Sequence, residues 1–393
     1  MDLHALTPEA EINRRIEKIH HAMTDAEMPA MLVTSNANIY YTTGRVINGY
    51  VYITAAGKPL YFVRRPLGIE APDVIYIHKP EQIVEKLQER GLELPDTIGM
   101  ELGLLDVMTF ERLKKAFPGI KPVNASPVLR AARSVKTDFE LDLLRRSGVK
   151  HERVYRRIPH LYQDGMSDIE LQIEIERVSR LEGCLGQFRI AGESMELFMS
   201  NILAGDNADA PTPYDFAMGG AGLDPSLPVG ANGTVIKPGM TVMVDSNGNF
   251  TGYMTDMTRV FSLGDVSDIA LKAHQCSIDI CREVEKHATP GTPASKLYEL
   301  AINLVNERGL ERYFMGHTQK AGFIGHGVGI EINELPVIAP RSRDILVKDN
   351  VIALEPKFVI PHVGAVGIEN TYIVTDKGLE CITTAPEEII SLN

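Results

Sequence analysis

The chain of 393 residues contains no tryptophan and only four cysteines. These cysteines are scattered along the sequence and form no CxxC pair, which predicts reduced thiols in a cytoplasmic protein. No apolar run reaches the roughly eighteen residues of a membrane span. The N-terminal segment MDLHALTPEAEINRR also lacks the apolar core of a secretory signal. We therefore expect a cytoplasmic chain without a membrane partner.

Basic residues are outnumbered by acidic ones. Lysine and arginine total 40 against 52 acidic residues, which gives a net charge of −12. A surface that binds nucleic acid needs a basic stripe, so this balance argues against a nucleic-acid partner. The apolar share of 44% is ordinary for a globular protein, and the length predicts two domains.

One stretch, residues 242–261, organises the C-terminal half. It reads VMVDSNGNFTGYMTDMTRVF, in which two apolar runs flank a turn rich in glycine and asparagine, as is typical of a β-hairpin. The hairpin would bring Asp245 and Asp256 together, where two carboxylates repel each other and lose hydration. A metal ion between them is the simplest remedy, and two solvated turn aspartates are the plainer alternative.

Three further ligand-type residues follow in short apolar runs of strand type. His326 lies in IGHGVGIEINELP, Glu355 in VIALEPKF and Glu369 in AVGIENTYIV. Such groups are unfavourable inside apolar strands unless they are paired or bind a metal. One imidazole and four carboxylates suit Mn, Co, Fe or Zn, and four carboxylates can neutralise two divalent ions. Taken singly, each residue is better explained as an ordinary turn, loop or edge-strand residue.

The order Asp, Asp, His, Glu, Glu resembles the ligand order of the pita-bread metallopeptidases. The motifs VDSNGNFTGYMTDMTR, GHGVGI, LEP and GIEN carry the resemblance. This family comprises Xaa-Pro aminopeptidases, Xaa-Pro dipeptidases (prolidases) and methionine aminopeptidases, with creatinase as a relative. The ligand spacings resemble those of the prolidase branch, and with them the five residues together favour a site for two metal ions.

The resemblance implies an α+β fold with two domains. A pita-bread catalytic domain would span residues 133–393, and a smaller α/β creatinase-like domain, carrying NIYYTTG, would span residues 1–132. The capping box from Thr137 to Glu140 marks the boundary. Because the family's N-terminal domain contributes to a dimer contact, the resemblance also implies a homodimer.

Local signals predict individual elements. Thr7-Pro8 predicts a helix capped by Thr7 that runs to about Asp25, and Thr292-Pro293 predicts another that ends near Gly309. Further predictions are a strand at MLVTS, a loop and strand at NIYYTTG, a hairpin in VYITAAGKPLYFV, a capping box at Ser167–Glu170 and a helix over roughly Asp268–His287.

The resemblance also assigns roles to the five residues. Asp245 would bind one ion, Asp256 and Glu369 would bridge both, and His326 and Glu355 would complete the other. A metal-bridging hydroxide would attack the amide bond before proline in a small peptide, and Glu355 would carry the proton to the leaving nitrogen. Glu355 and His326 are therefore the predicted catalytic residues.

The histidines that contact substrate in this family are missing here. Their positions are occupied by Val229, Gly322 and Asn333, and an arginine of the family is replaced by Gly367. His317 and His362 lie near the motifs and could be replacements, although ordinary loop histidines are the favoured interpretation. Arg259, three residues after Asp256, is interpreted as a structural or supporting charge.

Three hypotheses follow. The first is a metal-dependent Xaa-Pro peptidase that cleaves the amide bond before proline in a small peptide, or a closely related small amide. The second is a pita-bread hydrolase or lyase that acts on another small metabolite, as creatinase does on creatine, because the substrate histidines are replaced. The third is a catalytically silent binding module, which the five retained ligands argue against.

Overall fold

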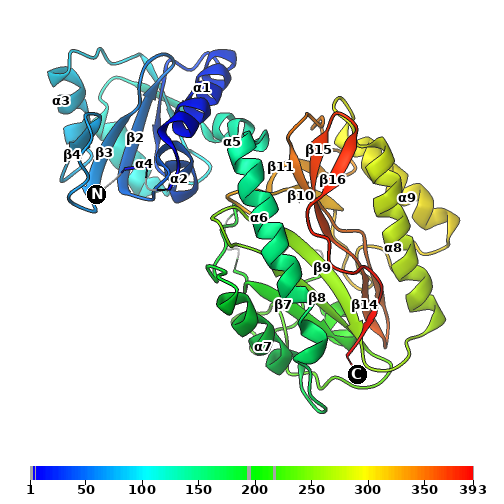
Figure 1. The fold of residues 1–393 in the computed structure, drawn as a ribbon. Helices are drawn as coiled ribbons and strands as arrows, with labels where there is room; N and C mark the ends of the chain where they lie inside the picture. The colour runs from blue at the N-terminus through cyan, green and yellow to red at the C-terminus, as the bar shows by residue number, and fades with distance from the viewer. Residues whose placement is uncertain (1–2, 5, 193–195, 216–217, 393) are drawn as a thin grey trace. The chain divides into compact units, whose positions relative to one another are not determined.

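The computed structural model describes residues 3–4, 6–192, 196–215 and 218–392 (Figure 1). The chain divides into two compact units, Met1–Arg133 and Ser134–Asn393. None of the helices formed by the described residues combines the length and the apolar character that a bilayer span requires.

The N-terminal unit is built on a six-stranded sheet with the order β4-β3-β2-β1-β5-β6. Strand β1 is buried throughout, and β2 and β3 form an antiparallel hairpin, so the predictions for MLVTS and VYITAAGKPLYFV are confirmed. Its elements are α1 (Glu9–Asp25), β1 (Ala30–Val33), α2 (Asn36–Thr43), β2 (Asn48–Thr54), β3 (Leu60–Arg65), β4 (Val74–Tyr76), α3 (Gln82–Glu89), β5 (Thr97–Met100), α4 (Val107–Ala116), β6 (Lys121–Asn124) and α5 (Ser126–Ser134).

Two local predictions were wrong. The NIYYTTG segment lies in helix α2 and not in a loop and strand, because Ser35 caps the helix by accepting from the Asn38 amide and Gly44 ends it at φ 73°. Thr7 is not the cap of α1. The cap position is taken by Pro8, whose extended backbone (ψ 143°) keeps it outside the helix, and Pro293 takes the same position before α9.

The C-terminal unit has three sheets, with the orders β17-β9-β8-β7, β11-β10-β12-β15-β16 and β13-β14. Its elements are α6 (Asp138–Tyr155), η1 (Ile158–His160), α7 (Asp168–Leu181), β7 (Ser200–Ala204), η2 (Gly205–Asp209), β8 (Thr241–Asn247), β9 (Asp256–Ser262), α8 (Asp268–His287), α9 (Ala294–Glu307), β10 (Gly325–Gly327), β11 (Glu334–Ile338), β12 (Val351–Leu354), β13 (Lys357–Ile360), β14 (Gly364–Gly367), β15 (Asn370–Thr375), β16 (Gly378–Cys381) and β17 (Ile390–Ser391).

Helices cover the sheets of this unit from two sides. Apolar residues of α6 and α7 pack on β7, β8 and β9, whereas α8 and α9 form a second core with β12–β15. Figure 1 shows the strands between these two helix pairs. The predicted helix Asp268–His287 is α8, and both predicted capping boxes are present.

The predicted hairpin of residues 242–261 is confirmed. Strands β8 and β9 are antiparallel, and their register places Asp245 opposite Thr258 and Asn247 opposite Asp256. Because side chains two residues apart share a face of a strand, Asp245 and Asn247 point to the same side of β8.

The caps of α7 and α8 provide a test of the helix signals. Ser167 accepts from the Glu170 amide, whereas Ser267, in the same position before α8, makes no side-chain cap bond. We expect Ser167→Ala to lower the free energy of unfolding by about 1 kcal/mol, because the helix loses that acceptor. The matched Ser267→Ala should change it by about 0.5 kcal/mol or less. Urea denaturation of both variants measures the difference, and equal effects would contradict the assignment.

Candidate metal centre

The five predicted ligand residues come from separate segments of the C-terminal unit. Asp245 lies in β8, Asp256 begins β9 and His326 is the middle residue of β10. Glu355 follows β12 directly, and Glu369 lies between β14 and β15, where it bridges to Thr258 of β9. The site is therefore made where strands of two different sheets meet.

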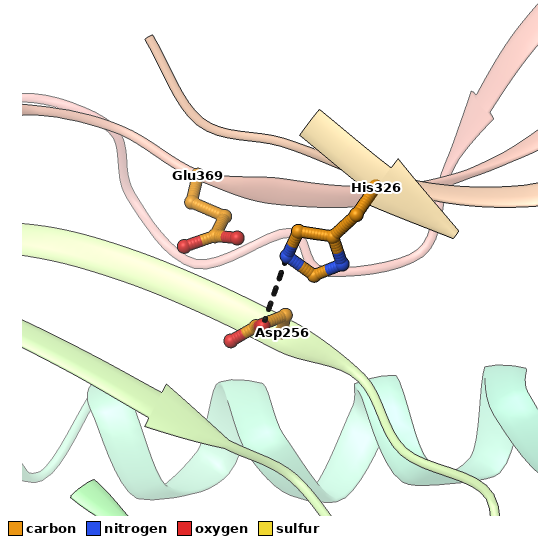
Figure 2. Close-up of side chains that lie close together, drawn as sticks. All are labelled: Asp256, His326 and Glu369. Carbon is orange, nitrogen blue, oxygen red and sulfur yellow. Dashed lines mark ion pairs between the residues drawn. The ribbon is translucent and has the colours of Figure 1, made fainter. Parts of the chain in front are cut away.

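The structure brings all five side chains together in two overlapping groups. Asp256, His326 and Glu369 form one, and Asp245, Glu355 and Glu369 form the other; within each group the candidate ligand atoms lie within 4.8 Å of one another. Figure 2 shows the first group, with the His326 ring beside the Glu369 carboxylate and its Nε2 3.8 Å from Asp256 Oδ2. The same nitrogen lies 3.4 Å from Glu355 Oε1.

Three of the four carboxylates, those of Asp256, Glu355 and Glu369, are buried. Burial, together with the Glu369 charge, raises the pKa of Asp256 well above its usual range. Burial and the nearby Glu355 raise the pKa of Glu369 to about 7. Ionised carboxylates this close need a cation beside them, since desolvation and mutual repulsion both oppose their charge.

One cation is already supplied by the chain. The fully buried Lys357 donates from Nζ to Asp245 Oδ2 at 2.9 Å, to Glu355 Oε2 at 2.7 Å and to Glu369 Oε2 at 3.0 Å. Burial alone would raise the pKa of Glu355, but the Lys357 ammonium holds it at about 2. Burial alone would lower the pKa of Lys357, and the three carboxylates instead raise it well above its ordinary value.

The two groups differ in their fit to a divalent ion. In the Asp256–His326–Glu369 group, Glu369 Oε1 is buried and has no hydrogen-bond partner among the residues that the structure describes. The imidazole of His326 and the carboxylates of Asp256 and Glu369 are a ligand set that suits a divalent ion. In the other group, Lys357 binds an oxygen of each member. The residues therefore fit an ion in the first group and do not fit one in the second.

The sequence interpretation missed Lys357, although a signal was present. A lysine heads the apolar run KFVI of β13, and a buried lysine in a strand needs an acidic partner. Asn247 was missed as well. It is buried on the face of β8 that carries Asp245, and within the described part of the chain neither amide atom has a partner.

The structure gives the surroundings of each position that lacks one of the family's histidines. Val229 is buried, and the Asn333 amide is used in two hydrogen bonds with the backbone of Ala191, at 2.7 and 2.6 Å. Gly322 is open, because an added Cβ would meet nothing within 4 Å. Gly367, at φ 127°, would place a Cβ 2.7 Å from the Pro356 carbonyl oxygen, so a larger residue is excluded there.

His317 and His362 contact other groups. His317 Nδ1 lies 3.1 Å from Asp209 Oδ2, and the largely exposed His362 has its Nδ1 3.2 Å from Asp206 Oδ2. Neither belongs to the metal-type groups found among the described residues. Their contacts agree with the interpretation as loop histidines.

Arg259 is fully buried and supports the site through the backbone of Glu369. Its guanidinium donates to the Glu369 carbonyl at 2.9 Å and to Asn370 Oδ1 at 2.8 Å, so it holds the backbone that carries the last ligand-type residue. It also binds the C-terminal segment through the carbonyls of Thr383, Ala385 and Pro386.

Removing Arg259 should destabilise the whole unit. We expect Arg259→Met to lower the free energy of unfolding by about 3 kcal/mol or more, because several buried acceptors lose their donor. The control Arg145→Met breaks an exposed pair with Glu380 and should cost about 1 kcal/mol or less. Denaturant unfolding compares the two variants, and equal losses would refute the structural role of Arg259.

Comparisons with known proteins agree with this architecture. The Xaa-Pro dipeptidase of Pyrococcus horikoshii is 25% identical over 391 residues, covering 96% of this chain and 99% of the relative. The solved Xaa-Pro dipeptidase from Bacillus anthracis superposes with a TM-score of 0.79 at 22% identity, covering 97% of this chain and 99% of that one. The X-Pro aminopeptidase from Thermotoga maritima gives 0.76 at 20% identity, with coverages of 94% and 99%.

The fold and the site together define a two-domain hydrolase with a pita-bread catalytic domain. Residues 15–135 match the creatinase/prolidase N-terminal domain, and residues 142–376 match metallopeptidase family M24. The chain belongs to metallopeptidase family M24. The fold class and the family resemblance predicted from the sequence are thereby confirmed.

Proposed function

We propose that this chain is a metal-dependent hydrolase of small amide substrates, with the peptide bond before proline as the first candidate. One observation carries the proposal: four carboxylates and one histidine from five separate segments converge in two overlapping groups. The relative from Pyrococcus horikoshii, which the chain matches over nearly its whole length, is an Xaa-Pro dipeptidase.

We place a divalent ion at Asp256, His326 and Glu369. When bound, such an ion would supply a Lewis acid that polarises the substrate carbonyl and makes a water more acidic. The ion would also offset the repulsion between the buried carboxylates, because Asp256 and Glu369 could then both be ionised. The choice among Mn, Co, Zn and Fe, the homodimer and the cytoplasmic location stay predictions from the sequence. The second ion predicted from the sequence would need the oxygens of Asp245, Glu355 and Glu369 that Lys357 already binds.

The chain's own groups would orient the reactants. Thr258 Oγ1 donates to Glu369 Oε2 at 2.8 Å, which leaves Oε1 as the Glu369 oxygen without a hydrogen-bond partner among the described residues. Glu355 remains our candidate for the proton carrier through Oε1, the oxygen on the His326 side, because Oε2 is bound by Lys357. We further propose that the catalytic domain occupies residues 133–393, after an N-terminal domain at residues 1–132.

A second candidate is a hydrolase or lyase that acts on a small metabolite other than a peptide. The residues that stand in place of the family's histidines favour this second candidate. Val229 offers no side-chain donor, and the Asn333 amide is already bonded to Ala191. A substrate without a proline carboxylate would need neither group.

The ion assignment predicts the metal content of a double variant. Asp256→Asn with Glu369→Gln should abolish retention of Mn²⁺ through gel filtration, because two of the three proposed ligands lose their charge. The control Asp209→Asn removes a carboxylate paired with His317 outside the site and should retain the ion. Metal analysis by mass spectrometry measures both, with melting temperatures to check folding. Unchanged retention in the double variant would refute the assignment.

The substrate proposal is tested on Xaa-Pro and non-proline dipeptides, with Mn²⁺ or Co²⁺ and with a chelator. We expect metal-dependent cleavage specific to proline. Because an added Cβ at Gly322 meets nothing within 4 Å, we introduce a donor there with Gly322→His, which should raise kcat/KM by about ten-fold or more. The control Gly322→Leu adds similar bulk without a donor and should give no rise. Silence of metal-loaded wild-type protein and of Gly322→His across the panel would favour the second candidate.

A further inference from the structure

We propose that the Lys357 ammonium is a built-in cation that takes the place of one divalent ion, so that each chain holds a single ion, in the Asp256–His326–Glu369 group. The inference rests on the proposed function only for the location of that ion. In this role Lys357 positions the carboxylates of Asp245, Glu355 and Glu369.

The contacts of Lys357 saturate its hydrogen-bonding capacity. An ammonium group has three N–H donors, and Lys357 Nζ has one carboxylate oxygen within 3.0 Å for each of them. The acceptors belong to Asp245, Glu355 and Glu369, which are also the three members of the second group. A divalent ion in that group would need the same carboxylates, so the ammonium and the ion compete for one place.

The fold holds Lys357 in that place. It begins β13 two residues after Glu355, and its Cα is paired with Gly367 of β14. An added Cβ at Gly367 would lie 3.0 Å from the Lys357 Cα, so glycine there lets the two strands approach. The lysine backbone is bonded on its other side to Met315, whose amide donates to the Lys357 carbonyl at 2.8 Å. The side chain is fully buried and cannot turn into solvent without unpacking this region.

Repulsion from the ammonium opposes a second ion. Four ionised carboxylates carry four negative charges, of which the ammonium and one divalent ion together neutralise three, so one negative charge remains. A second divalent ion would have to enter beside a buried ammonium, where like charges repel strongly because little water screens them.

Glu369 links the two cations. Its Oε2 accepts from Lys357 and Thr258, whereas its Oε1 is buried without a partner among the described residues. Figure 2 shows the Glu369 carboxylate beside the His326 ring and across from Asp256. One oxygen of Glu369 therefore serves the lysine, and the other is left for the metal ion.

The test is the number of ions per chain. Wild-type protein is saturated with Mn²⁺, freed of excess ion by gel filtration and analysed for metal by mass spectrometry. We expect one ion per chain and the six-line electron paramagnetic resonance spectrum of isolated Mn²⁺. Lys357→Met keeps an unbranched side chain but removes the charge, and should bind two ions with an exchange-coupled spectrum.

The control is Lys136→Met, which removes another buried lysine, paired with Glu334 at 2.8 Å outside both groups. It should leave the stoichiometry at one. Two ions or none in the wild-type protein would overturn the inference, and so would a single ion in a folded Lys357→Met variant. If that variant does not fold, calorimetric titration of the wild-type protein with Mn²⁺ still decides by its stoichiometry. Failure of the proposed function is distinct, because it would appear as protein that holds one ion and cleaves no dipeptide.

Discussion

Mutual repulsion among buried carboxylates is the constraint on which the site depends. Asp256, Glu355 and Glu369 are buried and Asp245 adjoins them, so the folded unit must supply positive charge or leave some of them protonated. Lys357 supplies part of this positive charge through its ammonium group. The divalent ion that we propose for Asp256, His326 and Glu369 would supply the rest and would couple metal binding to the stability of the fold.

The scaffold around these charges serves to hold them in place. The β8–β9 hairpin sets Asp245 and Asp256, and Arg259 of β9 fixes the backbone of Glu369 together with the C-terminal segment. Because Arg259 makes its bonds mainly with backbone carbonyls, it acts on the site by holding the backbone in place. The scaffold is that of metallopeptidase family M24, whereas Val229, Gly322 and Asn333 stand where the family resemblance places substrate histidines.

Much of the fold could be predicted from local signals. The hairpin of residues 242–261, the capping boxes and helix α8 all follow from short patterns whose physics is local. The errors were local as well. The NIYYTTG segment is rich in residues that favour strands, yet the cap at Ser35 and the left-handed Gly44 make it a helix. Pro8 takes the cap position expected for Thr7, because its backbone is extended.

Local sequence patterns are enough to identify the ligand-type residues and their order, since Asp245, Asp256, His326, Glu355 and Glu369 stand in apolar runs where polar groups need partners. The partner of each residue depends on the tertiary structure. Lys357 and Glu369 are twelve residues apart, and Asp245 lies on another sheet, so their contact depends on how β13 pairs with β14 and packs near β8. No local sequence pattern encodes the contacts of Lys357 with Asp245 and Glu369. These contacts place an ammonium group where the sequence predicts a second metal ion.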